Sequence, residues 1–189
     1  MSKASNKSQW IIGTVLLIGA FGIAIVGMAV ADFGENEDRV LVGASANSEA
    51  QYTSECGACH IAYLAGFLPE RSWKNIMGSL DNHFGENAEL DTDTGTIITG
   101  YLVANAGENS TNRKARKFMR NIVATDVPLR ITGLSYFKRK HDEVPVRYVK
   151  DNPDVGSFSQ CQACHGDKAA SGIFNEHTVN IPNYGRWDD

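Results

Sequence analysis

The chain has 189 residues, of which 42% are hydrophobic and 21% charged, and its formal net charge is −4. This length fits one or two domains, and the absence of any low-complexity segment excludes a chain of biased composition. The charge is unevenly spread. Residues 113–150 hold 11 basic and 3 acidic side chains, whereas residues 32–112 hold 3 basic and 13 acidic ones. A basic band therefore lies between two acidic regions, because residues 151–189 hold 2 basic and 6 acidic side chains.

The first predicted element is a transmembrane helix over residues 10–31. No charged residue or proline interrupts this segment, and 21 helical residues from Ile11 would span about 32 Å, enough to cross the hydrocarbon core of a bilayer. A cleavable signal peptide is the alternative, because Ala29-Val30-Ala31 has the Ala-x-Ala form of a cleavage site. The apolar run is longer than the core of such a peptide, which favours the retained anchor.

The charges on either side of this segment predict its orientation. Residues 1–9 carry Lys3 and Lys7, and acidic residues follow the apolar run. The positive-inside rule then places residues 1–9 in the cytoplasm and the rest of a single-pass protein on the periplasmic side of the cytoplasmic membrane. Residues 32–47 are predicted to form a tether.

Two five-residue motifs contain every cysteine of the chain. Residues 56–60 are Cys-Gly-Ala-Cys-His and residues 161–165 are Cys-Gln-Ala-Cys-His. Two thiols three positions apart can add to the two vinyl groups of one porphyrin, and the next residue places an imidazole beneath the iron. A zinc site, two disulfides or a redox pair would leave the repeated histidine unexplained. The motifs predict two covalently attached haems c, bound through Cys56, Cys59, Cys161 and Cys164, with His60 and His165 as proximal ligands.

A helix predicted to begin at Pro69 and end at Gly85 supplies a candidate sixth ligand for the first haem. Its apolar residues recur at helical spacing, and His83 falls only about 20° from them around the helix axis. Met77 lies on the same helix, rotated by about 120° from His83, so the two side chains cannot both reach one iron. His83 is favoured, with Met77 as the alternative. The apolar stripe comprises Trp73, Ile76, Met77, Leu80 and Phe84.

Two more helices are predicted before residue 128. One covers residues 92–106 and ends at Gly107. The next is capped by Ser110 or Thr111, and a face of Ala115, Phe118, Met119, Ile122 and Val123 lies opposite basic residues. Such a basic face could meet acidic lipid or an acidic redox partner, but a solvated face that balances haem propionates is the simpler interpretation. Nucleic acid is not expected as a partner in this compartment.

Beyond Pro128 the helical periodicity weakens, and three further prolines divide the chain into short pieces. We therefore expect a mainly α fold in which a helical first haem unit, residues 48–108, precedes a loop-rich second unit, residues 109–189. The residues leave open which side chain is the sixth ligand of the second haem. His141 and His177 are the candidates, and Met119 is a remote one.

With these motifs the chain resembles the dihaem cytochrome c family over residues 52–182. The resemblance implies that both haems have two histidine ligands, with His83 and His141 in the sixth positions and His177 left over. It also implies a first unit similar to a class I cytochrome c. Leu64-Ala65 and the predicted anchor depart from the family pattern. Besides both haem motifs, the shared residues are Leu68-Pro69, Ser72-Trp73, Met77, His83-Phe84-Gly85, Tyr101-Leu102, Arg130-Ile131-Thr132, Phe137, His141 and Ile181-Pro182.

Members of that family donate electrons to an oxygen-binding monohaem cytochrome and are often encoded with a membrane cytochrome b. The resemblance therefore implies a membrane-anchored carrier of single electrons between a membrane quinol-oxidising or cytochrome b partner and an extracytoplasmic cytochrome acceptor, rather than an enzyme. A haem wiring subunit of a larger respiratory or photosynthetic membrane complex is the alternative. A dihaem peroxidase or a ligand sensor would need an exchangeable position on one iron.

Overall fold

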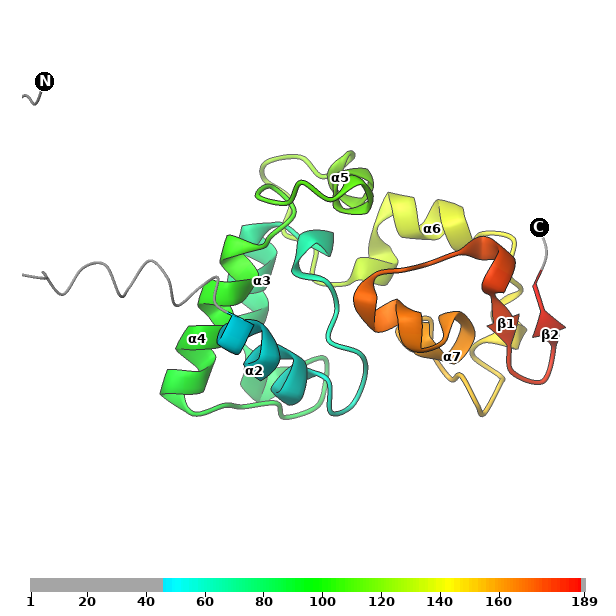
Figure 1. Cartoon of the computed structure of the whole chain (residues 1–189), viewed down its shortest axis with the longest axis horizontal. Helices are drawn as coiled ribbons and strands as arrows, with labels where there is room; N and C mark the ends of the chain where they lie inside the picture. The colour runs from blue at the N-terminus through cyan, green and yellow to red at the C-terminus, as the bar shows by residue number, and fades with distance from the viewer. Residues whose placement is uncertain (1–45, 188–189) are drawn as a thin grey trace, which may run out of the picture. The chain divides into compact units, whose positions relative to one another are not determined.

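The computed structural model describes residues 46–187, and these residues are mainly helical, as predicted (Figure 1). Within residues 46–187, six α-helices, several short 3-10 helices and one short hairpin follow one another. No helix within this part is long and apolar enough to cross a bilayer. The predicted anchor, residues 10–31, lies outside the described residues, as do residues 1–9 and most of the predicted tether. The helices are α2 (Ala46–Cys56), α3 (Glu70–Met77), α4 (Thr92–Ala104), α5 (Arg113–Met119), α6 (Ser135–His141) and α7 (Cys161–His165).

Helix α4 packs against both α2 and α3, and the first haem motif begins at the last residue of α2 (Figure 1). The side chain of Asp91 caps α4 by accepting hydrogen bonds from the backbone N–H groups of Asp93 and Thr94. This cap starts the helix that carries Ile98 and Leu102, whose side chains are fully buried. The prediction of a helix over residues 92–106 is confirmed, with its end two residues earlier than expected.

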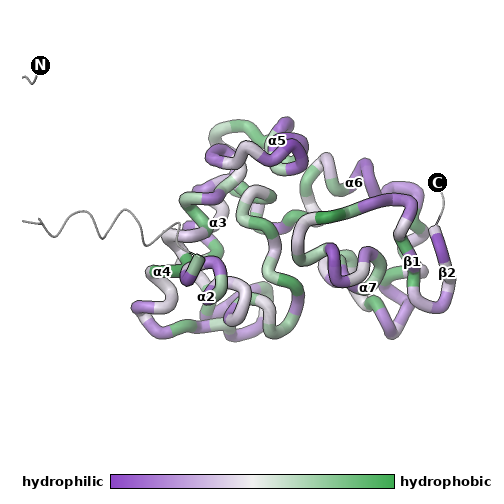
Figure 2. The backbone as a smooth tube through the Cα atoms, viewed as in Figure 1, coloured by the Kyte–Doolittle hydropathy of each residue, from purple (hydrophilic) through white to green (hydrophobic). Residues whose placement is uncertain are grey.

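One hydrophobic core runs through both predicted haem units. In the tube of Figure 2, hydrophobic segments recur along both halves of the described chain. The described residues belong to one compact unit. The predicted division between residues 108 and 109 stays a prediction. The core includes Tyr52, Phe67, Leu68, Trp73, Ile98, Leu102, Phe118, Leu134 and Phe137.

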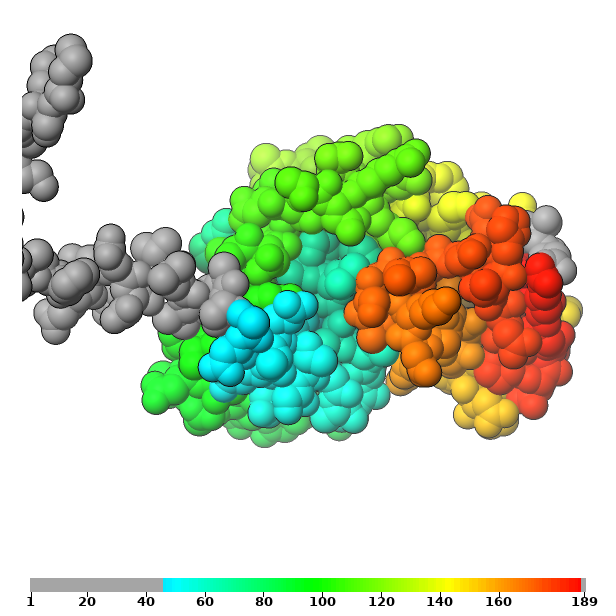
Figure 3. All heavy atoms as spheres, viewed as in Figure 1, coloured from blue at the N-terminus to red at the C-terminus, as the bar shows by residue number. Residues whose placement is uncertain are grey.

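Helix α5 lies close to the 3-10 turn Ala65–Phe67, and glycine permits this approach. A Cβ atom on Gly66 would lie 2.9 Å from the Cβ of Ala115 and 3.2 Å from the Oγ of Ser110. Asn112, rather than Ser110 or Thr111, caps α5 through hydrogen bonds from the N–H groups of residues 114 and 115. The predicted cap was therefore one or two residues too early. In the space-filling view the atoms of this region lie along the upper edge of the molecule (Figure 3).

The second half contains short elements joined by loops, as predicted. Strands β1 (Asn180–Ile181) and β2 (Gly185–Arg186) form an antiparallel hairpin in which Asn180 pairs with Arg186. The buried side chain of Asn152 donates to the carbonyl oxygens of Tyr148 and Pro182, at 3.0 and 2.7 Å. One amide side chain therefore ties the hairpin to the preceding loop, where few regular backbone hydrogen bonds are available.

Two sequence-based boundaries were wrong. Helix α3 ends at Met77 with Gly78 as its cap, so it does not extend to residue 85. Phe84 has φ of 60° and is 43% exposed, and it therefore does not continue the apolar stripe into the core. Val123, predicted on the buried face of the third helix, is 59% exposed in the loop after α5.

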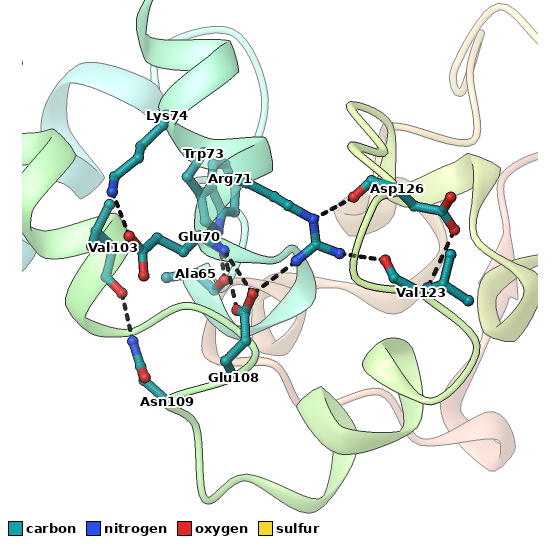
Figure 4. A network of polar contacts seen from close by, with 10 residues as sticks. All are labelled: Ala65, Glu70, Arg71, Trp73, Lys74, Val103, Glu108, Asn109, Val123 and Asp126. Carbon is teal, nitrogen blue, oxygen red and sulfur yellow. Dashed lines mark hydrogen bonds and ion pairs between the residues drawn. The ribbon is translucent and has the colours of Figure 1, made fainter.

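The loop after α5 is held by a polar network centred on Arg71 of α3 (Figure 4). The Arg71 guanidinium donates to the carbonyl oxygens of Asp126 and Val123 and to the carboxylate of Glu108. The same carboxylate accepts a hydrogen bond from the backbone N–H of Glu70. Since the guanidinium presents several donors in a fixed plane, one side chain fixes both a loop and the segment that follows α4.

Candidate haem-binding sites

The two cysteine motifs adopt different backbone conformations. In the first, Cys56 is the last residue of α2, and the following residues form a turn. In the second, all five residues form α7, and Gly166 follows with φ of 67°. A Cβ atom on Gly57 would lie 2.3 Å from the carbonyl oxygen of Thr53, so glycine fits the turn at this point. In the second motif the matching position holds Gln162.

No disulfide joins any of the four cysteines. Burial, followed by the negative charge of Glu55, raises the pKa of Cys56 to about 11. Burial also raises the pKa of Cys161 to about 11 and that of Cys164 above its usual value. A raised pKa of this kind reflects a side chain that is partly removed from water.

His60 and His83 face each other at the first site. Their ring centroids lie 6.4 Å apart and the ring planes are inclined by 26°. The pKa of His83 is lowered by burial and then by the charges of His60 and Arg130, which keeps the ring neutral. A neutral imidazole retains the lone pair that a metal ligand needs.

His83 reaches this position from a turn rather than from a helix face. After α3 ends, a 3-10 turn, Leu80–Asn82, leads directly to His83. The backbone of His83 then pairs with Glu86: the His83 N–H donates to the Glu86 carbonyl at 2.7 Å, and the Glu86 N–H donates back at 3.2 Å. This tight turn fixes the ring against His60. The expected residue is therefore present, but the helical argument that selected it was wrong.

His165 and His141 face each other at the second site, with centroids 6.2 Å apart and ring planes inclined by 80°. Both rings line one cavity together with Cys161 and Cys164. Burial, then the charges of His141 and Lys114, lowers the pKa of His165 to about 4. The pKa of His141 is also lowered, mainly by burial. Both rings are therefore neutral at physiological pH.

The separations of both ring pairs match one metal ion between two imidazoles. With metal–nitrogen bonds of about 2.0 Å, two coaxial imidazoles place their centroids about 6.3 Å apart. The measured 6.4 and 6.2 Å agree with this value. The residues therefore fit an iron held between two imidazoles at each site, and one ring of each pair directly follows its own cysteine pair along the chain.

Hydrogen bonds from the outer ring nitrogens orient two of these rings. His60 Nδ1 lies 2.7 Å from the Ile61 carbonyl oxygen, and His141 Nδ1 lies 2.9 Å from the Phe137 carbonyl oxygen. Each bond leaves Nε2 available to a metal and fixes the direction in which it points. Within the described residues, His165 Nδ1 is buried and has no hydrogen-bond partner. Such a nitrogen costs about 1–3 kcal/mol unless a bound group satisfies it.

The remaining candidate ligands lie elsewhere. His177 is exposed in the 3-10 turn Glu176–Thr178, and it does not line the cavity that His141 and His165 share. Met77 packs against the hydrophobic core at the end of α3. Met119, the last residue of α5, approaches Gly107, because a Cβ there would meet its sulfur at 2.2 Å.

Sequence reasoning missed the aromatic side chains around the four imidazoles. Phe137 stacks on His141 at 3.9 Å between ring centroids, and Phe174 meets His165 edge-on at 5.1 Å. Tyr63 stacks on His60 at 4.5 Å with an angle of 17°. Tyr63 follows the first motif by only three residues, which was the available signal. Phe137 is among the residues shared with the family and lies four positions before His141, whereas Phe174 had no such signal.

Two cysteine pairs, each accompanied by two imidazoles whose spacing fits one iron between them, define a protein with two c-type haems. Consistent with this, a family model for dihaem cytochrome c matches residues 52–174. The chain belongs to the dihaem cytochrome c family and carries two covalently bound haems c. This membership favours electron transfer over catalysis.

Solved structures of similar proteins support the same assignment. The chain is 47% identical to the X-ray structure of a dihaem cytochrome c from Shewanella baltica, with a TM-score of 0.61, covering 75% of this chain and 98% of that one. It is also 47% identical to a dihaem cytochrome c from Rhodobacter sphaeroides, with a TM-score of 0.59, covering 66% and 95%. No curated protein matches the chain.

Proposed function

We propose that the protein carries single electrons through two haems, each with two histidine ligands. His60 and His83 are the axial ligands of the first haem, which Cys56 and Cys59 attach. His165 and His141 are those of the second, attached through Cys161 and Cys164. The spacing of the two ring pairs, 6.4 and 6.2 Å, supports this assignment most directly. The exposed position of His177 supports His141 as the second distal ligand.

Ligation of this kind suits an electron carrier. Each haem iron supplies a one-electron couple when bound, and two protein ligands leave no open position for a substrate. The protein holds the imidazoles of His60 and His141 in fixed orientations, through the carbonyl oxygens of Ile61 and Phe137, so little rearrangement is needed when the charge of the site changes. Aromatic rings also pack on these two imidazoles.

The proposed partners are a membrane quinol-oxidising complex or cytochrome b and an extracytoplasmic cytochrome acceptor. Support for a membrane location comes from the apolar segment at residues 10–31 and the charges around it. The haem-bearing part would then lie on the periplasmic side of the cytoplasmic membrane. An anchored protein of this kind can also serve as a wiring subunit of a larger respiratory or photosynthetic complex. Co-purification with a membrane partner in mild detergent would distinguish that role from a free carrier.

Carbon monoxide binding and a redox titration of the haem-loaded protein test the carrier function. We expect both haems to be low-spin in either oxidation state, the reduced protein not to bind carbon monoxide, and both midpoint potentials to be low. The low potentials follow because neither iron has the methionine ligand that raises them. Stoichiometric carbon monoxide binding at one haem would instead support a peroxidase or a ligand sensor.

A further inference from the structure

Tyr63 is in direct contact with the first site. Its ring stacks on His60 with 4.5 Å between centroids and 17° between planes. At this separation the two aromatic faces are in van der Waals contact, and the offset stack contributes beyond simple area burial. Tyr63 therefore covers one face of the proposed proximal ligand of the first haem.

The other end of the same side chain reaches the second site. The Tyr63 hydroxyl donates a hydrogen bond of 2.8 Å to the carbonyl oxygen of Ser159, two residues before Cys161. Tyr63 also lines the cavity that contains His141, His165 and Cys161. One side chain thus joins segments that are 96 positions apart in the sequence and belong to different haem sites.

Tyr63 is held in place from three directions. Besides the stack and the Ser159 bond, its own carbonyl oxygen accepts a hydrogen bond of 2.6 Å from the hydroxyl of the buried core residue Tyr52. The phenol hydroxyl is the donor in the bond to Ser159, and an ordinary phenol keeps its proton at physiological pH.

We propose that Tyr63 is a positioning residue that couples the two haem sites, setting their separation and providing the packed route by which an electron passes between them. The proposal rests on the carrier function proposed above. In the transfer, one site loses the electron and becomes ferric while the other gains it and becomes ferrous. Tyr63 is neither oxidised nor reduced and releases no proton. Packed atoms and a hydrogen bond along the route favour tunnelling over a route through empty or water-filled space.

The test measures electron exchange between the sites in the haem-loaded full chain. A one-electron photoreductant is added below stoichiometry, and rapidly frozen samples are examined by electron paramagnetic resonance, in which each ferric site is quantified separately. Tyr63→Phe keeps the stack and removes the hydrogen bond to Ser159, whereas Tyr63→Leu removes both. Tyr148→Leu is the matched control, because Tyr148 stacks on Tyr184 at 3.8 Å and lines neither site.

We expect Tyr63→Leu to slow exchange about tenfold or more, because it removes both the stack on His60 and the hydrogen bond to Ser159 and so loosens the geometry between the sites. Electron exchange in Tyr63→Phe should be slower than in the wild type, by a margin larger than any change seen in the Tyr148→Leu control. It should still be faster than in Tyr63→Leu. Both variants should keep two low-spin haems.

Exchange at the wild-type rate in Tyr63→Phe would overturn the proposal, whatever Tyr63→Leu does and whether or not that variant loads both haems. That outcome leaves the carrier function intact as long as the wild type remains low-spin and does not bind carbon monoxide. High-spin wild-type protein would instead overturn the ligand assignment, and this is measured in the same samples before any variant is compared.

Discussion

Burial keeps the imidazoles of His83, His141 and His165 neutral, and this makes the protein sensitive to acid. Burial is the largest cause of the lowered pKa of His83, His141 and His165, and at the second site the nearby Lys114 adds to it for His165. A buried imidazole is suited to iron ligation and unsuited to protonation. The same burial that prepares the ligands therefore sets the lower pH limit of the fold.

A pH titration of stability checks this residue-scale argument. The pKa of His165 is lowered from 6.5 to about 4, so the folded state binds fewer protons than the unfolded state between these values. The free energy of unfolding should therefore be constant above pH 6.5 and fall progressively as pH drops through the window toward 4, since iron ligation requires the same neutral ring. Denaturant unfolding at a series of pH values measures it.

His177→Ala is the control for this titration, because His177 is exposed and its replacement should leave the curve unchanged. A free energy of unfolding that stays flat from pH 6.5 to 4 in the haem-loaded protein would contradict the argument.

Individual site residues were predicted well from the sequence within the two haem motifs and poorly around them. The five-residue spacing is chemically specific, whereas no sequence pattern points to the contacts of Phe158 with His141 and of Phe174 with His165.

Among the elements, α5 depends on its close approach to the 3-10 turn Ala65–Phe67. We expect Gly66→Ala to lower the free energy of unfolding by about 1–3 kcal/mol, because its Cβ would lie 2.9 Å from the Cβ of Ala115 and neither backbone can move freely. Gly95→Ala is the matched control within α4: its Cβ would meet nothing within 4 Å, and alanine should stabilise the helix by up to about 1 kcal/mol. Equal stability of the two variants would show that the approach is not tight.

The polar network of Figure 4 provides a second prediction for the elements. Arg71→Leu removes three hydrogen bonds between α3, the segment after α4 and the loop after α5. We expect a loss of about 1–3 kcal/mol in the free energy of unfolding. Lys74→Ala, which breaks only an exposed ion pair with Glu70, should change it by less than about 0.5 kcal/mol. If Arg71→Leu were as stable as Lys74→Ala, the network would not hold the loop.

Helix periodicity predicted α4 well and α3 poorly, for a physical reason. Asp91 and the apolar residues of α4 specify one continuous helix. After Pro69, by contrast, apolar residues keep recurring at helical spacing although the α-helix ends at Met77. Gly78 is the signal that was available, because glycine commonly ends helices. The stripe nonetheless led to His83, since a 3-10 turn followed by a tight backbone pairing also brings that ring inward.

For the whole molecule, the family and its two haems could be predicted from the sequence, while the joining of the sites could not. Two short motifs carry the haem chemistry, but the contact between Tyr63 and Ser159 depends on how residues 96 positions apart are folded together. No periodicity encodes such a contact. The continuous core from Tyr52 to Phe137 was likewise hidden from a residue-by-residue argument.

The proposed membrane anchor is tested at this scale by deleting residues 1–31 behind a cleavable export signal. We expect the full chain to sediment with membranes and to need detergent for release, and the shortened protein to be soluble with both haems attached. The reason is that 21 apolar residues partition into a bilayer and the remainder of the chain has no comparable segment. Full-length protein in the soluble fraction, with residues 10–31 retained, would contradict the anchor.

Electron paramagnetic resonance of the fully oxidised, haem-loaded protein tests the central claim most directly. The ring planes are inclined by 26° at the first site and 80° at the second. Nearly parallel imidazoles separate the energies of two iron d orbitals, and nearly perpendicular imidazoles leave them almost equal. We therefore predict two low-spin signals, one rhombic and one with much larger g anisotropy.

His83→Ala should abolish only the rhombic signal and His141→Ala only the anisotropic one, each leaving one haem high-spin. His177→Ala should change neither signal. Two low-spin signals that survive His141→Ala, or one that disappears in His177→Ala, would contradict the assignment of two facing histidine pairs.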